Sequence, residues 1–179
     1  MSITKLNYKT IDSTNTEAKR LFSKLSPENY HTLNDTVLIA ENQTAGKGRL
    51  GRSFYSSEKN GIYLSYIKTG KNIINPASIT ATTAVAVCNA IQKTLGLSTQ
   101  IKWVNDIYIE DKKVCGILTE GRIDGSSGCI SAFVVGIGIN LVTSNFPEEI
   151  KNRAGRVLKN SLELKDEIYR QIPKAVFEE

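Results

Sequence analysis

The chain has 179 residues, of which 40% are hydrophobic and 23% are charged. These proportions are typical of a folded globular domain and exclude an intrinsically disordered protein. The formal net charge of +5 is a modest excess that fits a nucleic acid, a nucleotide or an acidic protein as partner. The first residues lack the apolar core of a signal peptide, and no apolar run approaches the length of a membrane span. We therefore expect a cytoplasmic protein without a membrane partner.

The cysteines and the histidine limit the chemistry that the side chains can perform. Cys88, Cys115 and Cys129 are odd in number and show no CxxC spacing, which predicts reduced, buried thiols. His31 is the single histidine, so the sequence disfavours both a zinc site and a histidine-based catalytic triad.

The predicted elements begin with a helix that starts near residue 13. Thr14 and Glu17 have the spacing of a capping box, in which each side chain bonds to the backbone amide of the other residue. The apolar residues that follow at helical spacing are Ala18, Leu21, Phe22 and Leu25. The apolar runs 36–41 and 61–67 are predicted to be strands.

A second helix and a set of hairpins are predicted in the rest of the chain. Residues 76–95 begin with proline and are rich in Ala, Val and Ile, which is typical of a buried helix packed on a sheet. Strands are expected at 101–109, 113–120 and 129–137, with turns at Asp111-Lys112 and Asp124-Gly125, and the amphipathic tail from Ser161 is expected to be helical. Helices set among antiparallel pairings predict an α+β fold.

One loop, residues 41–56, concentrates basic residues and glycines. Its sequence, ENQTAGKGRLGRSFYS, contains GxGxxG after a predicted strand, as a dinucleotide-binding turn would. No amphipathic helix pattern follows it, and no acidic residue closes the next predicted strand, so we reject that interpretation. The glycines instead make this loop flexible, so that it can close on phosphate oxygens. Its cations are Lys47, Arg49 and Arg52. The alternative is a solvated basic loop without a ligand.

Two further clusters follow predicted strands. Lys102-Trp103-Val104-Asn105-Asp106 places a cation and a carboxylate close together at the end of an apolar strand. Gly136-Ile137-Gly138-Ile139-Asn140 allows close approach of the backbone and ends in a side chain that can pair with an adenine edge. Each cluster alone could equally be an ordinary turn at the end of a strand.

In this order the clusters resemble the signature motifs of biotin protein ligases. Asp12-Ser13-Thr14-Asn15 is similar to that family's opening signature, and residues 43–52 are similar to its Gly-Arg-Gly-Arg-x-x-Gly-Arg loop. Residues 102–106 resemble its Lys-Trp-Pro-Asn-Asp motif, and residues 136–140 resemble its Gly-x-Gly-Ile-Asn motif. The resemblance covers roughly residues 8–142.

The chain departs from these motifs at two positions. Lys47 replaces the first arginine of the loop. It keeps the positive charge but lacks the planar guanidinium group that can bond two phosphate oxygens at once. Val104 replaces a proline and lacks its fixed φ angle. Neither change removes a reactive group.

The resemblance implies an α+β fold with a mixed, largely antiparallel sheet and helices packed on it. Residues 1–179 would be the catalytic domain, and we expect neither the small C-terminal β-barrel nor the N-terminal DNA-binding domain that other members carry. The implied reaction is ATP- and Mg²⁺-dependent attachment of biotin, through biotinyl-5′-AMP, to a lysine of a biotin carboxyl carrier protein. The expected partners are therefore biotin, ATP and the carrier domain, with a homodimer possible and no DNA.

The resemblance also assigns roles to residues at the matching positions. Lys102 and Arg49 would be catalytic and would hold the carboxylate of biotin against the α-phosphate of ATP. The residues implied in biotin binding are Ser13, Thr14, Asn15, Gln43, Lys47, Gly48, Arg49, Lys102 and Gly116. Those implied in binding ATP or the adenylate are Arg49, Arg52, Phe54, Lys102, Asn105 and Asn140. No residue is assigned to a metal, because Mg²⁺ would be carried by the phosphates of ATP.

Two other functions remain open from the sequence. A lipoate-type ligase or acyltransferase would share the fold family and the acyl-adenylate, although the glycine-rich basic loop and the Ser-Thr-Asn start favour biotin. A non-enzymatic nucleic-acid-binding module would use the same cations for phosphates. It would, however, spread them over a face with aromatic stacking residues rather than gather them in one loop.

Overall fold

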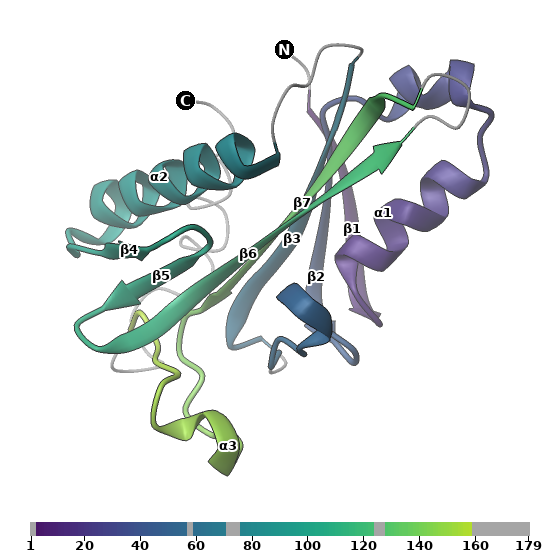
Figure 1. Ribbon diagram of the computed structural model, residues 1–179. Coiled ribbons are helices and arrows are strands. Elements are labelled where there is room, and N and C mark those ends of the chain that lie inside the picture. The colour runs from purple at the N-terminus through teal and green to yellow at the C-terminus, as the bar shows by residue number, and fades with distance from the viewer. Residues whose placement is uncertain (1–2, 57–58, 71–75, 124–127, 159–179) are drawn as a thin grey trace.

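The fold is built on one twisted sheet (Figure 1). The computed structural model describes residues 3–56, 59–70, 76–123 and 128–158. Within these ranges seven strands run in the order β1-β2-β3-β7-β6-β5-β4. The strands are β1 (Thr4–Ile11), β2 (Thr36–Gln43), β3 (Gly61–Thr69), β4 (Gln100–Lys102), β5 (Asp106–Ile109), β6 (Lys112–Ile123) and β7 (Ile130–Asn140). β1 and β2 pair in parallel, and the other neighbours pair antiparallel, which confirms the predicted α+β fold with a mixed, largely antiparallel sheet.

Two longer helices cover opposite faces of this sheet. The helices are α1 (Thr14–Ser23), α2 (Pro76–Leu95) and α3 (Glu148–Lys151), with 3-10 helices η1 (Pro27–Leu33) and η2 (Arg49–Gly51). Phe22 of α1 belongs to the same buried cluster as Val134, whereas Ile91 of α2 belongs to the cluster of Val135. Because successive residues of a strand point to opposite faces, α1 and α2 lie on the two sides of β7 and its neighbours.

Most of the predicted elements are present. The predicted helix over 76–95 is confirmed by α2, and the strands predicted at 36–41, 61–67, 113–120 and 129–137 are confirmed as β2, β3, β6 and β7, with bounds that differ by a few residues. The single strand predicted over 101–109 is wrong, because the chain turns between Lys102 and Asp106 and the two halves pair antiparallel as β4 and β5.

The strand β1 was not predicted. It lies at the edge of the sheet and pairs only with β2, and its residues are exposed or half-buried along its whole length. An edge strand of this kind needs no continuous apolar run, so the hydrophobic pattern gave no signal for it.

The capping box predicted at the start of α1 is wrong. Ser13 is the N-cap and makes no side-chain cap hydrogen bond, while the Glu17 amide donates to the Ser13 carbonyl at 2.9 Å. The Glu17 carboxylate instead accepts from Arg20 Nη1 at 2.9 Å. The chain entering the helix is held by Asp12, which accepts from the Ser13 amide at 2.8 Å. Arg20 also donates to Asp12 and holds the pKa of that carboxyl below its ordinary value.

The environments of the three cysteine side chains differ. Cys115 is fully buried, and burial raises the pKa of its thiol. Cys88 is half-buried, whereas Cys129 is exposed. The prediction of buried thiols is therefore right for Cys115 and wrong for Cys129.

Two predicted elements fall outside the described residues: the turn at Asp124-Gly125 and the helical tail from Ser161. Among the helices that are described, none is both long enough and apolar enough to cross a membrane.

Candidate active site

Three strand glycines form the floor of a pocket beside the N-terminus of α1. Gly116 on β6 is paired with Gly138 on β7, and Gly136 lies two residues earlier on β7. A Cβ atom at Gly138 would lie 2.6 Å from the ring of Phe54, and one at Gly136 would overlap the side-chain amide of Asn15. Glycine is needed at these positions because other side chains approach the sheet backbone closely.

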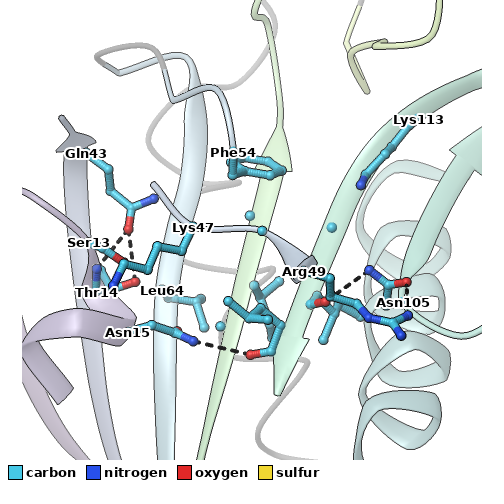
Figure 2. Close-up of a pocket in the computed structure, with 17 residues that line it drawn as sticks. Ser13, Thr14, Asn15, Gln43, Lys47, Arg49, Phe54, Leu64, Asn105 and Lys113 are labelled. Carbon is cyan, nitrogen blue, oxygen red and sulfur yellow. Dashed lines mark hydrogen bonds between the residues drawn. The ribbon is translucent and has the colours of Figure 1, made fainter. Parts of the chain in front are cut away.

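The walls of the pocket come from segments far apart in the sequence (Figure 2). The start of α1, the end of β2, the basic loop and the β5–β6 hairpin all contribute, and they surround about 460 Å³ of free space that is partly open to solvent. The predicted site residues that line it are Ser13, Thr14, Asn15, Gln43, Lys47, Gly48, Arg49, Phe54, Asn105 and Gly116.

The neutral end of the pocket is formed by the uncharged hydrogen-bonding groups of Ser13, Thr14 and Gln43. Gln43 Oε1 accepts from the Thr14 amide at 2.8 Å, and Gln43 Nε2 donates to Ser56 Oγ at 3.1 Å, which fixes the orientation of the Gln43 amide. The side chains of Ser13 and Thr14 lie beside this amide (Figure 2). Uncharged donors and acceptors suit a neutral polar ring better than they suit an ion.

The opposite end carries positive charge. Arg49 reaches from the basic loop and donates from Nη1 to Asn105 Oδ1 at 2.9 Å. Lys113 on β6 lines the same end, with its Nζ 2.7 Å from Asp106 Oδ1. Lys47 is a third cation of the lining, but its side chain lies beside Ser13 and Thr14 rather than at this end (Figure 2). At this end Arg49 and Lys113, against the single carboxylate of Asp106, create a positive potential that favours an anionic ligand.

The basic loop folds back on itself to make one wall of the pocket. The Gly48 amide donates to the Arg52 carbonyl at 2.7 Å, and the Phe54 amide donates to the Gly46 carbonyl at 2.8 Å. Phe54 is thereby laid over the glycine floor, where its ring meets Tyr63 edge-on at 6.3 Å between centroids. The short helix η2 gives way to extended chain at Arg52, in agreement with the rejection of a dinucleotide-binding turn.

Lys102 is a predicted catalytic residue that does not line this pocket. It pairs with Asp106, which pairs with Gly116, so it lies two strands from the glycine floor, or roughly 10 Å. Its Nζ makes a cation–π contact with Tyr108, at 5.3 Å from the centroid of the ring. Its catalytic role stays a prediction that requires the side chain to turn toward the pocket.

Asn140 and Arg52 also lie outside the lining of the pocket. Arg52 is exposed on the basic loop. Asn140 is 5% exposed and donates from Nδ2 to the Gly155 carbonyl at 3.1 Å, while its Oδ1 is buried without a hydrogen-bond partner. A buried acceptor without a partner costs about 1–3 kcal/mol, so a donor brought there by a ligand would be favourable. The predicted contact of Asn140 with adenosine stays a prediction.

Lys113 is a charged pocket residue to which the sequence assigned no role. Ile107 and Tyr108 are consecutive on β5, but they pair with Cys115 and Lys113, which are two residues apart on β6. Val114 is therefore an extra residue of β6 at a β-bulge. The bulge turns Lys113 to the face of Gly116, and its Nζ lies 3.3 Å from where a Cβ of Gly116 would be. Strict alternation along a strand would put these two residues on opposite faces, so the hydrophobic pattern could not predict this placement.

Comparison with known proteins places the site in a family. Residues 8–140 match the biotin/lipoate A/B protein ligase family, and this stretch contains the neutral end, the basic loop, Lys113 and the glycine floor. The chain belongs to this family.

Several curated family members are similar in sequence. The bifunctional ligase/repressor BirA of Bacillus spizizenii is 37% identical over 147 residues, which cover 80% of this chain and 43% of that protein. A biotin–[acetyl-CoA-carboxylase] ligase of Paracoccus denitrificans is 33% identical over 132 residues, which cover 73% of this chain and 51% of that protein. The chain thus spans about half the length, or less, of these curated relatives.

A solved structure of a family member has the same fold. Biotin protein ligase from Aquifex aeolicus in complex with biotin and ATP matches with a TM-score of 0.75 and 29% sequence identity. The match covers 97% of this chain and 70% of that chain. The whole described sheet and its helices therefore follow the architecture of this family.

Proposed function

We propose that this chain is the catalytic domain of a biotin protein ligase, which activates biotin with ATP and transfers it to a lysine of a carrier domain. The observation that carries the proposal is the two-ended pocket, in which a neutral hydrogen-bonding end faces a cationic end across a glycine floor. Biotin has a neutral ureido ring at one end and a carboxylate at the other, so its polarity matches that of the pocket. The A. aeolicus relative, which binds biotin and ATP, supports this assignment.

The first step brings two anions together. An oxygen of the biotin carboxylate attacks the α-phosphorus of ATP, and the bond from that phosphorus to the bridging oxygen breaks, which releases pyrophosphate. Arg49 and Lys113 line the cationic end. We propose that they contact the carboxylate and the α-phosphate, with Arg49 bridging two phosphate oxygens. Catalysis of this kind is mainly positioning and stabilisation of charge, so no nucleophile from the protein is required.

The second step uses an amine from outside the pocket. The lysine amine of the acceptor attacks the carbonyl carbon of the mixed anhydride, forms the amide and releases AMP together with a proton. The pocket's cations can stabilise the phosphate that leaves. The acceptor is proposed to be a biotin carboxyl carrier domain, and a cytoplasmic location would supply both the acceptor and ATP.

Magnesium is proposed to enter as part of the substrate Mg·ATP. In the part of the chain that the structure describes, no group of three or more His, Cys, Asp or Glu side chains is arranged to hold a metal ion. Asp106, the carboxylate at the cationic end, is already engaged by Lys113 and by Asn105 Nδ2. The phosphates of ATP are the proposed ligands of Mg²⁺.

The test separates the two half-reactions. The protein is incubated with Mg·ATP and either biotin or lipoate, with and without a biotin carboxyl carrier domain, and adenylate formation and acceptor labelling are scored separately. We expect biotin-dependent pyrophosphate release without acceptor, and AMP release with acceptor labelling when the carrier is present. Activity with lipoate and not with biotin would assign the chain to the other branch of the family.

A further inference from the structure

A buried chain of hydrogen bonds runs beneath the neutral end of the pocket. Ser65 on β3 is fully buried, and its Oγ lies 2.5 Å from Asn15 Oδ1 and 2.7 Å from Thr14 Oγ1. Asn15 Nδ2 lies 2.9 Å from Glu120 Oε2 and 3.3 Å from the carbonyl oxygen of Leu118. Asn15 and Thr14 are each 3% exposed, so water does not compete freely for these bonds.

The direction of each hydrogen bond follows from Glu120. An ionised carboxylate can only accept, and Leu118 offers a carbonyl, so Asn15 must turn Nδ2 toward both of them and Oδ1 toward Ser65. Because Oδ1 can only accept, Ser65 donates its single hydroxyl proton to Asn15. Ser65 has no second proton, so in its 2.7 Å hydrogen bond with Thr14 the Thr14 hydroxyl must be the donor. The hydroxyl proton of Thr14 therefore points into the sheet, and Thr14 Oγ1 is left as an acceptor.

Gln43 supplies a second acceptor beside the first. Its Oε1 accepts from the Thr14 amide at 2.8 Å and lies 3.2 Å from Thr14 Oγ1. Since the proton of Thr14 is directed to Ser65, these two oxygens face each other as acceptors at the neutral end of the pocket. A ligand N–H placed between them satisfies both, whereas a ligand atom without a proton leaves both unpaired.

We propose that Ser65 and Glu120 are positioning residues that determine specificity, because they hold Thr14 Oγ1 as an acceptor and so select a ligand ring that presents an N–H group. This inference rests on the proposed function and names the feature of biotin that the pocket recognises. A ureido ring presents N–H groups, but the dithiolane ring of lipoate presents none. A site built around hydrogen bonds to a substrate rejects an analogue that lacks the matching group much more strongly than an apolar pocket does.

The first test uses the unmodified protein and needs no substitution. Calorimetry measures the binding of biotin, of lipoate and of two carbamate analogues of biotin, in each of which one ureido N–H is replaced by oxygen with little change of shape. We expect at least one carbamate analogue, and lipoate, to bind on the order of 100-fold more weakly than biotin. Equal binding of biotin and both carbamates would overturn the inference and leave the proposed function intact. Absence of biotin binding would overturn the proposed function and this inference with it.

The second test compares two buried hydroxyl groups. Ser65→Ala should raise the KM for biotin about tenfold and reduce the preference for biotin over the weaker carbamate about tenfold, with kcat and the KM for ATP nearly unchanged. The control is Thr80→Val, which removes a buried hydroxyl that donates to Thr119 at 2.7 Å on the α2 side of the sheet. It should leave all these constants at their parent values. The inference would be overturned if Ser65→Ala kept the parent's preference for biotin over the carbamate. It would also be overturned if kcat and both KM values worsened by the same factor. If this variant does not fold, the binding of the carbamate analogues decides.

Discussion

Arg49 and Asn105 are 56 residues apart in the chain, and a hydrogen bond of 2.9 Å joins Nη1 of the arginine to Oδ1 of the asparagine. The bond ties the basic loop to the turn between β4 and β5. The Asn105 amide is itself fixed, because its Nδ2 donates to Asp106 Oδ1 at 2.9 Å and lies 3.3 Å from the carbonyl oxygen of Ile117. Arg49 is therefore held at the cationic end by a side chain that cannot easily turn away.

Loss of this arginine should loosen the hold on the adenylate more than the hold on the ureido ring. Arg49→Gly should still bind biotin measurably, but biotinyl-adenylate should dissociate on the order of 100-fold faster, because a bidentate contact with phosphate is gone. The escaped adenylate should then label lysines on unrelated proteins.

Asn105→Ala should speed dissociation of the adenylate about tenfold, since it removes only the hydrogen bond that supports Arg49. Both variants are tested by measuring the dissociation rate of biotinyl-adenylate and the labelling of unrelated proteins. If Arg49→Gly makes adenylate and retains it as tightly as the parent, Arg49 is not the residue that holds the adenylate.

Residues 46–52 should become more ordered when an anionic ligand binds. The loop carries Lys47, Arg49 and Arg52 close together, and Leu50 at its tip is 89% exposed with a left-handed φ of 55°. An anion relieves the repulsion among the cations, so backbone amide exchange and protease cleavage in this segment should slow when biotin and ATP are added. Equal rates with and without saturating ligand would contradict the proposed closing of the loop.

Lys113 should be needed for adenylate formation. Lys113→Ala should lower biotin-dependent pyrophosphate exchange on the order of 100-fold with little change in biotin affinity, because its ammonium lies at the end of the pocket that receives the phosphates. The family resemblance predicts a loss of similar size for Lys102→Ala, whose exposed side chain stands over Tyr108. Lys151→Ala is a matched control, since this exposed lysine pairs with Glu148 on α3. A folded Lys113 or Lys102 variant with normal exchange would remove that residue from the catalytic machinery.

Gly136 should tolerate no side chain. A Cβ atom there would overlap the amide of Asn15, which hydrogen bonds to Glu120 and to Ser65, the residue paired with Gly136 on β3, hold in place. Gly136→Ala should therefore lower the free energy of unfolding by about 1–3 kcal/mol and weaken biotin binding at the same time. Gly121→Ala on β6 is the control, because a Cβ there would meet Phe133 at an ordinary 3.4 Å. Thermal unfolding and biotin titration of the two variants test this, and equal behaviour would contradict the crowding of Gly136.

Asp35 should make stability depend on pH. It is 8% exposed and accepts from the Tyr66 hydroxyl and from Lys68 Nζ, the latter at 2.9 Å. Burial raises the pKa of this carboxyl, but the two hydrogen bonds outweigh burial and hold the pKa below its ordinary value. Because the folded-state pKa is lowered, the ionised group stabilises the fold at neutral pH. That contribution is lost as the pH falls from about 4, the unfolded-state value, through the folded-state pKa.

Asp35→Asn tests this dependence with little change of shape. Asparagine tolerates the left-handed φ of 56° at this position. The free energy of unfolding should fall by about 1–3 kcal/mol at neutral pH, and the difference from the parent should shrink in acid. Chemical denaturation of both proteins near pH 7 and near pH 3 measures the two differences. A difference of the same size at both pH values would show that ionised Asp35 does not stabilise the fold.

The sequence by itself determined the local features of this protein. Residues 76–95 begin with proline and are rich in Ala, Val and Ile, and the runs at 36–41 and 61–67 have the apolar pattern of strands. Local composition and pattern were therefore enough to predict α2, β2 and β3. The ordered motifs likewise predicted the family, because they depend on residue types at fixed spacing along the chain. Ten of the residues that these motifs named do line one pocket: Ser13, Thr14, Asn15, Gln43, Lys47, Gly48, Arg49, Phe54, Asn105 and Gly116.

The tertiary structure alone decided which side chains share that pocket. Lys113 enters it because a bulge at Val114 breaks the alternation of β6, and Lys102 stays outside because the chain turns after it to form a hairpin. Ser65 lies beneath the pocket because β3 pairs with β7, where Gly136 leaves room for Asn15. Bulges, strand order and buried hydrogen bonds join residues that are distant in sequence, and periodicity within one segment carries no information about them.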